Sequence, residues 1–423
     1  MLLPKKIIAG RDVFNGHLLG TVAEAEPIRY SYSRLLADKS IALVVTSGIS
    51  LYRSIDLARL LIRHGAEVTA VLSAKAARLV SPELFRWATG RRPIYKLTGR
   101  AEHISVCANA DVLVVAPATA NTIAKAALGI ADGVATTCIH AALGAGARAV
   151  FVPAMNLAMW RNPALQEALS RLRSWGALVV EPKVEEGKAK YPDVEEVAES
   201  VIDATAPRDM SGLRVLVTAG PTHEHIDDIK YISTPSSGLT GIYFAREAAA
   251  RGADVTLVAG PGVKPPPNVK AVPVVSILDM YKAVAELASS QDVMIFAAAP
   301  LDFYVAGKAS GKISSDLAEY VVKLVRAPKV AAEARRLNPR AVVVGFKAEY
   351  GVSEEELLSR ARARMEEGGW DLVLAHDVSK KGFGTLEDQY IAIYSDGRIE
   401  RLGPAHKREL ARAVLDRVLA LRR

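Results

Sequence analysis

Apolar and polar positions follow the same order in the two halves of the chain. In each half, short uninterrupted apolar runs alternate with segments in which apolar residues recur at helical spacing. Apolar runs of this length are typical of strands that are buried on both faces of a parallel sheet. The segments 58–73 and 245–260 align with each other without a gap, which indicates that one structural unit is used twice.

The repeated pattern predicts two tandem Rossmann-like α/β domains with mainly parallel sheets. We place the first domain over 1–206, with residues 1–30 as an extension packed on it, then a linker over 207–212 and the second domain over 213–423. Such sheets bind ligands outside the carboxyl ends of their strands. The expected strands are 41–45, 68–72, 112–116 and 149–152 in the first domain, and 213–217, 255–258 and 293–299 in the second.

Three strand ends of the first domain carry small, hydroxyl and amide residues. They read TSGIS (46–50), PATANT (117–122) and PAMN (153–156). Small residues let a flat ligand lie against the backbone, amides can bond its edge, and a helix start favours phosphate. The combination indicates a flavin site, although the turn at 46–50 alone is equally compatible with a structural role.

Two polar side chains near these loops have residue types that suit catalysis. His103 begins a predicted helix and suits a base or a polarising group, although a structural hydrogen bond is the alternative. Asn156 ends the PAMN loop and suits a carboxylate or amide of a substrate, or a simple turn. In the second domain, PSSG (235–238) precedes a helix and suits a phosphate or an ordinary helix cap.

Composition narrows the class of protein. The chain has no apolar run of about 18 residues and no signal peptide pattern, so we expect a cytoplasmic protein without a membrane partner. The net charge of +8 is spread among acids and no nucleic-acid motif is present, so it suits phosphorylated small substrates rather than nucleic acid. Cys107 and Cys138 lack CxxC spacing, so we expect neither a disulfide framework nor a zinc site.

The first-domain motifs resemble those of the flavin-containing cysteine decarboxylases. TSGIS, HIS (103–105), PATANT, GIAD (129–132) and PAMNLAMW (153–160) look most like the decarboxylase half of the bifunctional phosphopantothenoylcysteine decarboxylase/phosphopantothenate–cysteine ligase family. The resemblance implies that His103 and Asn156 are active-site residues, with Asn156 on the substrate carboxylate. It implies FMN contacts from Ser47, Gly48, Ser50, Ser73, Ala118, Thr119, Asn121, Thr122 and Met155.

The second domain resembles phosphopantothenate–cysteine ligase over the segments 215–241, 297–314, 345–350 and 370–384. The resemblance implies that CTP activates a carboxylate as an acyl-cytidylate, with Mg²⁺ on the triphosphate and Asp302 as a metal ligand. It implies that Lys312 stabilises charge on the reacting phosphate. The implied nucleotide contacts are Ala297, Ala298, Asp302, Lys312, Phe346 and Arg364, and the implied substrate contacts are Lys230, Thr234, Ser236, Ser237 and Gly238.

Together the two resemblances imply a bifunctional enzyme of coenzyme A biosynthesis. It would join 4′-phosphopantothenate to cysteine and decarboxylate the product to 4′-phosphopantetheine with FMN. They also imply a homo-oligomer, with trimers of the flavin domain and dimers of the ligase domain.

Departures from the family pattern leave three questions open. Bacterial members have a proton-donating cysteine in a flap that here reads EEGKAKYP (185–192), so Lys188, Lys190, Tyr191 or water would donate instead. Thr234 replaces an asparagine of the family, which leaves CTP against ATP undecided. The missing cysteine also permits a ligase whose FMN domain no longer decarboxylates and acts in assembly or regulation. A dinucleotide-dependent oxidoreductase is disfavoured because neither first turn has GxGxxG with a ribose-binding acid.

Overall fold

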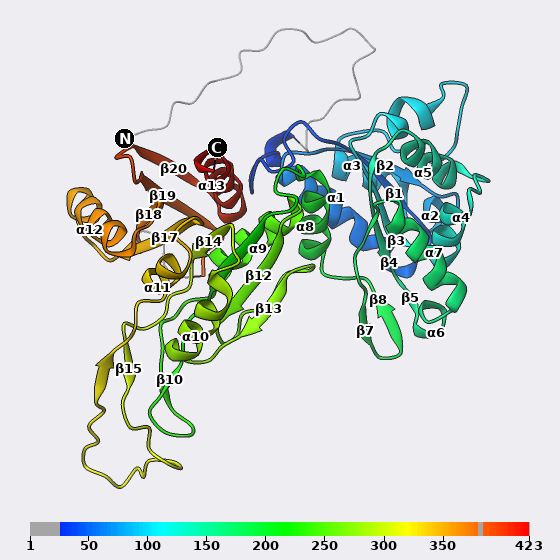
Figure 1. Cartoon of the computed structure of the whole chain (residues 1–423). Helices are drawn as coiled ribbons and strands as arrows, with labels where there is room; N and C mark the ends of the chain where they lie inside the picture. The colour runs from blue at the N-terminus through cyan, green and yellow to red at the C-terminus, as the bar shows by residue number, and fades with distance from the viewer. Residues whose placement is uncertain (1–25, 380–383, 423) are drawn as a thin grey trace. The chain divides into compact units, whose positions relative to one another are not determined.

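Two α/β units make up the chain, and the computed structural model describes residues 26–379 and 384–422. The units divide between Ala204 and Thr205. Each has a mainly parallel sheet with helices packed on it (Figure 1), which confirms the predicted architecture. Most of the expected extension over 1–30, and part of the segment 370–384, lie outside the described residues. No helix within the described ranges combines the length and the apolar character needed to cross a membrane.

The first unit contains a five-stranded parallel sheet in the order β2-β1-β3-β4-β6. Its strands are β1 (Ser40–Val45), β2 (Glu67–Leu72), β3 (Val112–Ala118), β4 (Arg148–Pro153) and β6 (Leu178–Val179). A small antiparallel sheet joins β5 (Met155–Asn156), β8 (Lys188–Lys190) and β7 (Lys183–Glu185). The helical segments are η1 (Glu26–Ile28), η2 (Ile49–Tyr52), α1 (Arg53–Arg63), α2 (Ala76–Leu79), α3 (Pro82–Thr89), η3 (His103–Ala108), α4 (Ala120–Leu128), α5 (Val134–Gly144), α6 (Leu157–Trp160), α7 (Pro163–Ser174) and α8 (Val194–Thr205).

Both faces of this sheet are buried, which explains its uninterrupted apolar strands. Ile41, Leu43 and Val45 of β1 pack in the core that includes α1 and α8. Ala42 and Val44, which point to the other face, pack in the core that includes α4, α5 and α7. Alternate residues of one strand therefore serve two separate cores.

The second unit contains an eight-stranded sheet in the order β13-β12-β9-β14-β17-β18-β19-β20. Its strands are β9 (Arg214–Ala219), β12 (Asp254–Ala259), β13 (Lys270–Pro273), β14 (Val293–Phe296), β17 (Val342–Glu349), β18 (Leu372–Asp377), β19 (Glu387–Tyr394) and β20 (Ile399–His406). Two short hairpins pair β10 (Glu224–His225) with β11 (Tyr231–Ile232), and β15 (Phe303–Val305) with β16 (Leu324–Arg326). The helices are α9 (Leu239–Ala250), α10 (Ile277–Ala288), α11 (Val330–Leu337), α12 (Glu354–Gly368) and α13 (Lys407–Leu421). The first six strands are parallel, whereas β19 and β20 add an antiparallel edge.

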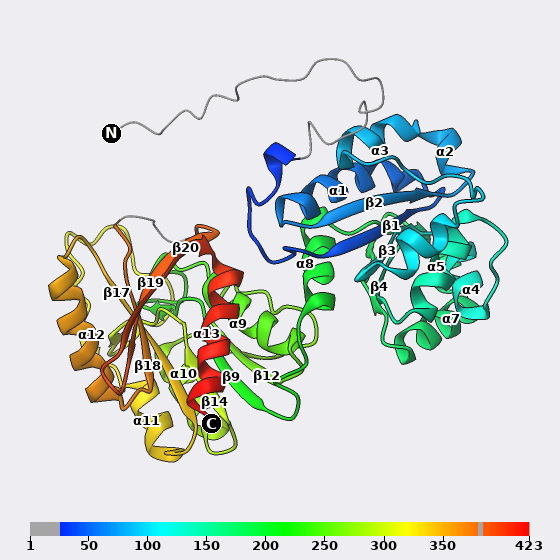
Figure 2. The same cartoon turned by 90° about the horizontal axis from the view of Figure 1, so that it is seen from above.

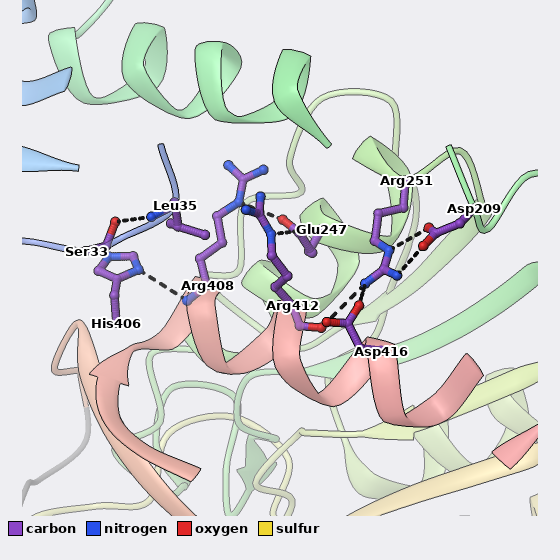
Figure 3. A network of polar contacts seen from close by, with 9 residues as sticks. All are labelled: Ser33, Leu35, Asp209, Glu247, Arg251, His406, Arg408, Arg412 and Asp416. Atoms are coloured by element: carbon purple, nitrogen blue, oxygen red, sulfur yellow. Dashed lines mark hydrogen bonds and ion pairs between the residues drawn. The ribbon is translucent and has the colours of Figure 1, made fainter. Parts of the chain in front are cut away.

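A buried ion-pair network joins α9 to α13, which lie side by side (Figure 2). The side chain of Glu247 in α9 is fully buried, and its two oxygens accept from Arg408 Nε at 3.0 Å and Arg412 Nε at 2.7 Å (Figure 3). Because a buried charge is costly without its partners, these contacts specify how the two helices pack.

The expected linker over 207–212 is built into the second unit. Asp209 makes two hydrogen bonds with the buried Arg251 guanidinium, at 2.8 and 2.6 Å, and Asp416 of α13 binds the same group at 2.7 Å (Figure 3). Met210 is fully buried, and its N–H donates to the Arg251 carbonyl. Asp209 and Met210 are therefore held by Arg251, the residue that caps α9, and Arg251 is in turn bound to α13.

Candidate functional site

A cavity of about 460 Å³ lies at the carboxyl ends of the parallel strands of the second unit. It is bordered by residues at or beyond the ends of β14, β17 and β18, and by the start of α9. The predicted residues that line it are Ser236, Ser237, Gly238, Ala297, Ala298, Asp302, Phe346 and Arg364. Lys230, Thr234 and Lys312 do not line it.

The PSSG loop turns directly into α9 beside this cavity. Gly238 caps the helix with a φ of 75°, which lies in the left-handed region that favours glycine. Gly241 lies so close to β9 that a Cβ atom there would be 2.8 Å from the Thr218 carbonyl oxygen. Thr234 fastens the loop from the other side, because its hydroxyl donates to the Ala299 carbonyl at 2.6 Å. The first N–H groups of α9 are thereby placed at the cavity wall, where they suit a phosphate.

Cations surround Asp302 at the cavity. Lys329 Nζ donates to Asp302 Oδ1 at 2.9 Å. This hydrogen bond, together with the charges of Lys329, Arg364 and Lys347, holds the pKa of Asp302 below its usual range despite partial burial. Lys347 directly follows the predicted Phe346 in the sequence, whereas no sequence signal marked Lys329. Three cations at one cavity suit a chain of phosphates.

The cavity does not provide a metal centre from side chains alone. Within the described residues there is no group of three or more histidines, cysteines, aspartates and glutamates that could hold a metal ion. Asp302 contributes a single carboxylate, which is already paired with Lys329. A magnesium ion bound here would take most of its ligands from substrate phosphates and water, as Mg²⁺ usually does.

Lys230 and Lys312 lie on two segments that Asp227 holds together. The buried Asp227 carboxylate accepts from the N–H groups of Ile229, Lys230 and Ile313 at 2.6–3.0 Å, and from Lys230 Nζ at 2.9 Å. These bonds, led by the Lys230 N–H, hold the pKa of Asp227 well below its usual range, so it is ionised at neutral pH. Lys312 is exposed on the arm that carries β15 and β16 (Figure 1), outside the cavity lining.

An acid–histidine pair that the sequence did not reveal also lines the cavity. His376 Nδ1 is 3.3 Å from Asp388 Oδ1, and Asp388 Oδ2 accepts from the Tyr390 hydroxyl at 3.2 Å and lies 3.5 Å from Lys407 Nζ. Burial acts to raise the pKa of Asp388, but the hydrogen bond and charge of His376 and the charge of Lys407 outweigh it and hold this pKa below its usual range. No local spacing in the sequence relates His376 to Asp388.

In the first unit, the three predicted loops meet at the ends of β1, β3 and β4, which are neighbours in the sheet. Thr46 Oγ1 donates to the Pro117 carbonyl at 2.6 Å and accepts from the Thr119 N–H at 3.3 Å. The Ala154 N–H donates to the Ala118 carbonyl at 3.3 Å. The loops therefore form one continuous edge, as their positions at strand ends predicted.

The hydroxyl and amide groups of this edge differ in what they bind. Thr119 caps α4 by accepting from the Thr122 N–H, and Ser73 accepts from the Ala76 N–H, so both are used locally. Asn121 is exposed, while Ser47, Gly48 and Met155 are half-buried.

Among the predicted FMN-contact and catalytic residues, two buried polar atoms lack partners within the described ranges. Ser50 Oγ and His103 Nδ1 make no hydrogen bond with any described residue. Buried polar atoms in folded proteins almost always have a partner, so each of these two atoms is available to bond a ligand. Gly48 lies so close to Pro117 that a Cβ atom at position 48 would be 3.3 Å from the proline ring, so this position favours a residue without a side chain. The residues present therefore fit a flat ligand with polar edges, such as a flavin.

Asn156 and Lys188 face each other in the small sheet of the first unit. They are direct partners in the antiparallel pair of β5 and β8. Residues opposed in this way carry their side chains on the same face, with Cβ atoms about 4.5–5.5 Å apart. Both residues are exposed, and Asn156 Oδ1 accepts from the Ala158 N–H at 2.8 Å.

Lys190 and Tyr191 are placed differently from Lys188. Lys190 Nζ lies 2.8 Å from a Glu186 oxygen and 3.3 Å from a Glu185 oxygen, and the hydrogen bond that Lys190 donates to Glu186 raises the pKa of Lys190. Tyr191 is buried in the core, and this burial raises the pKa of its hydroxyl well above the usual range. Both arrangements make proton release at neutral pH harder.

A disulfide joins Cys107 to Cys138, which corrects the expectation of none. Cys107 lies in η3, the segment that begins with His103, and Cys138 lies in α5. Their Cα atoms are 5.3 Å apart and both side chains are buried. The contact depends on how η3 packs against α5, which residue spacing does not predict. The bond holds the His103 segment against α5.

Comparisons with known proteins match both units. The family model described as Flavoprotein matches residues 29–206, and that of the DNA/pantothenate metabolism flavoprotein C-terminal domain matches 210–421. The chain is 40% identical over 392 residues to the "Coenzyme A biosynthesis bifunctional protein CoaBC" of Thermococcus kodakarensis, covering 91% of this chain and 96% of that protein. The protein of the same name from Methanocaldococcus jannaschii is 35% identical to the chain over 394 residues, covering 92% of this chain and 95% of that protein. A crystal structure of the C-terminal domain of a CoaBC protein is 28% identical, with a TM-score of 0.43, and covers 51% of this chain and 97% of that chain.

Proposed function

We propose a function from one premise: this chain belongs to the family of coenzyme A biosynthesis bifunctional proteins. Its second unit joins 4′-phosphopantothenate to cysteine, and its first unit decarboxylates the product to 4′-phosphopantetheine. The observation that carries the proposal is a pair of sites on one chain. One is a helix start facing a cavity with three cations. The other is the strand-end edge of the first unit, which carries the unpartnered Ser50 hydroxyl, together with the unpartnered Nδ1 of His103 in the same unit.

The ligase reaction first converts the carboxylate of phosphopantothenate into a better acyl donor. Its oxygen attacks the α-phosphate of a nucleoside triphosphate, pyrophosphate leaves, and the amine of cysteine then displaces the nucleoside monophosphate. The N–H groups at the start of α9 suit one phosphate, and Lys329, Lys347 and Arg364 suit the charge of the triphosphate. We propose CTP as the nucleotide and Mg²⁺ as its companion ion, with Asp302 beside it.

The decarboxylase reaction needs an electron sink next to the carboxylate. Bound FMN supplies the reversible two-electron oxidation that allows a saturated carbon to lose carbon dioxide. Ser50 Oγ would bind the edge of that cofactor, and the Asn156 amide would hold the substrate carboxylate. His103 Nδ1, which has no partner among the described residues, would move a proton at the reacting carbon or sulfur.

Lys188 is the proposed proton donor in place of the flap cysteine, because it faces Asn156 while Lys190 is engaged by two glutamates. We expect Lys188→Met to slow formation of phosphopantetheine by about 10²-fold or more. Release of carbon dioxide in a single turnover should continue, since this proton is needed afterwards. The measurement is product mass beside trapped carbon dioxide, with Lys190→Met as the matched control. Equal losses in the two variants would contradict the assignment.

We propose a homo-oligomer, with trimers of the flavin unit and dimers of the ligase unit. Exposed apolar side chains on the arm, among them Leu317, Tyr320 and Val321, suit contact with a second copy. In the first unit, an apolar cavity of about 430 Å³ between α4 and α7, bordered by Leu128 and Met159, suits the same role. Light scattering on the purified full chain measures the state.

One assay tests the bifunctional proposal. The purified chain is incubated with phosphopantothenate, cysteine, Mg²⁺ and either CTP or ATP, and the products are identified by mass. We expect phosphopantetheine to form when CTP is the nucleotide. We also expect an absorbance band at about 450 nm from bound flavin. Accumulation of phosphopantothenoylcysteine with no loss of carbon dioxide would instead support the second hypothesis, a ligase with an inactive flavin unit. The absence of a cysteine from the flap at 185–192 is the observation that favours it.

A further inference from the structure

The amine that completes ligation has to lose a proton before it can react. At neutral pH the amino group of cysteine is mainly an ammonium ion, which has no lone pair with which to attack an acyl carbon. The three cations around Asp302 cannot accept this proton, because they are already protonated. The cavity therefore needs a base that the family resemblance did not supply.

The carboxylates in the cavity wall are poorly suited to this task. The pKa of Asp302 is held down first by the hydrogen bond from Lys329, and that of Glu367 first by the hydrogen bond from Arg364. The pKa of Asp388 is also held below its usual range, and both of its oxygens already have hydrogen-bonding partners. Each is therefore a weaker base than an ordinary carboxylate.

His376 has the geometry that these groups lack. Its Nδ1 bonds Asp388 Oδ1, while Asp388 Oδ2 accepts from Tyr390 and faces Lys407, and the Gln389 N–H donates to Oδ1 at 2.9 Å. A carboxylate held in this way accepts the Nδ1 proton, so the neutral imidazole carries its lone pair on Nε2. Because His376 lines the cavity, Nε2 is the nitrogen left to meet a ligand.

Other charged groups near His376 are mostly paired with each other. Within the cavity it shares the wall with Lys347, which pairs with Glu349 at 2.7 Å, and with Lys407. His376 also lines a second cavity, of about 210 Å³. The charged residues in the wall of that cavity are Glu354 and Arg401, which form an ion pair, and Asp377.

We propose that His376 is a catalytic base of the ligation, with Asp388 as its positioning residue; the inference rests on the ligase function proposed above. Nε2 takes one proton from the cysteine ammonium as the nitrogen attacks the acyl carbon. The N–C bond forms, the C–O bond to the nucleotide phosphate breaks, and the nucleoside monophosphate leaves with that electron pair. The second proton on nitrogen goes to water, and the imidazolium then releases its proton to solvent.

The test separates the two half-reactions in a His376→Asn variant of the full chain. Pyrophosphate release without cysteine reports acyl-nucleotide formation, and we expect it to match the wild type within about threefold, which also shows that the variant is folded. Transfer to cysteine should fall by about 10²-fold or more at neutral pH and recover as the pH is raised. Transfer to hydroxylamine, an amine that is largely unprotonated at neutral pH, should stay near the wild-type rate.

Two further variants sharpen the result. Asp388→Asn should slow transfer to cysteine and spare hydroxylamine, as expected of a residue that acts through His376. His223→Asn, a histidine of the same unit outside the cavity lining, should change neither rate. An equal loss with both amines, or a loss of pyrophosphate release, in the His376 variant would overturn the base assignment. If the wild type releases no pyrophosphate, the proposed ligase function fails and the inference falls with it.

Discussion

Replacing His103 by asparagine is expected to lower decarboxylation by about 10²–10⁴-fold, the usual contribution of a positioned acid or base. The reason is local, because His103 Nδ1 is buried and makes no hydrogen bond with any described residue, which leaves it available to a ligand. Phosphopantothenoylcysteine should accumulate, since the ligase unit is untouched. Mass analysis of products over time, with flavin absorbance recorded on the same sample, measures the effect.

The internal control for this variant is the ligation rate of the same chain, which should not change. Bound flavin should also remain, because asparagine retains a hydrogen-bonding group and the Cys107–Cys138 bond still holds the segment. Decarboxylation at the wild-type rate in a flavin-loaded variant would remove His103 from the reaction.

Replacing Glu247 by alanine is expected to destabilise the second unit by about 3–5 kcal/mol, the cost of breaking a buried ion pair from one side. Glu247 and Arg408 are fully buried, and the variant removes the carboxylate that Arg408 and Arg412 both contact. Scanning calorimetry on the full chain measures the effect. If the unit binds CTP as proposed, its transition should shift upward when CTP is added, which identifies it.

The matched control is Asp396→Ala, which removes an exposed ion pair with Arg398 in the same unit. Exposed pairs contribute little, so no resolvable shift is expected there. A Glu247 variant as stable as this control would mean that the helices α9 and α13 do not depend on the charge network.

The strand ends were predictable because local pattern determines them. The strands β1, β3, β9 and β14 are mainly apolar runs that are followed by small or polar residues. This pattern predicted both the positions of the strands and the loops at their ends. The antiparallel edge of β19 and β20 was not predicted, because its strands expose one side and have weaker apolar patterns.

The side chains that the sequence missed are those brought in by tertiary packing. His376 and Asp388 lie on adjacent strands and Lys407 begins a later helix, so no local spacing relates them. The disulfide depends in the same way on the packing of η3 against α5. Lys312 shows the converse, because its motif was recognised but its place on an arm outside the cavity lining was not.

Asp227 connects two stretches of the chain that are far apart in the sequence. One carboxylate holds the N–H groups of Ile229 and Lys230, just before the PSSG loop, and that of Ile313, next to Lys312 on the arm. The two stretches are therefore joined directly by hydrogen bonds to one side chain. In a chimera of two relatives, these stretches would have to be transferred together. Transfer of one stretch alone would separate the Asp227 carboxylate from the Ile313 N–H group that it binds.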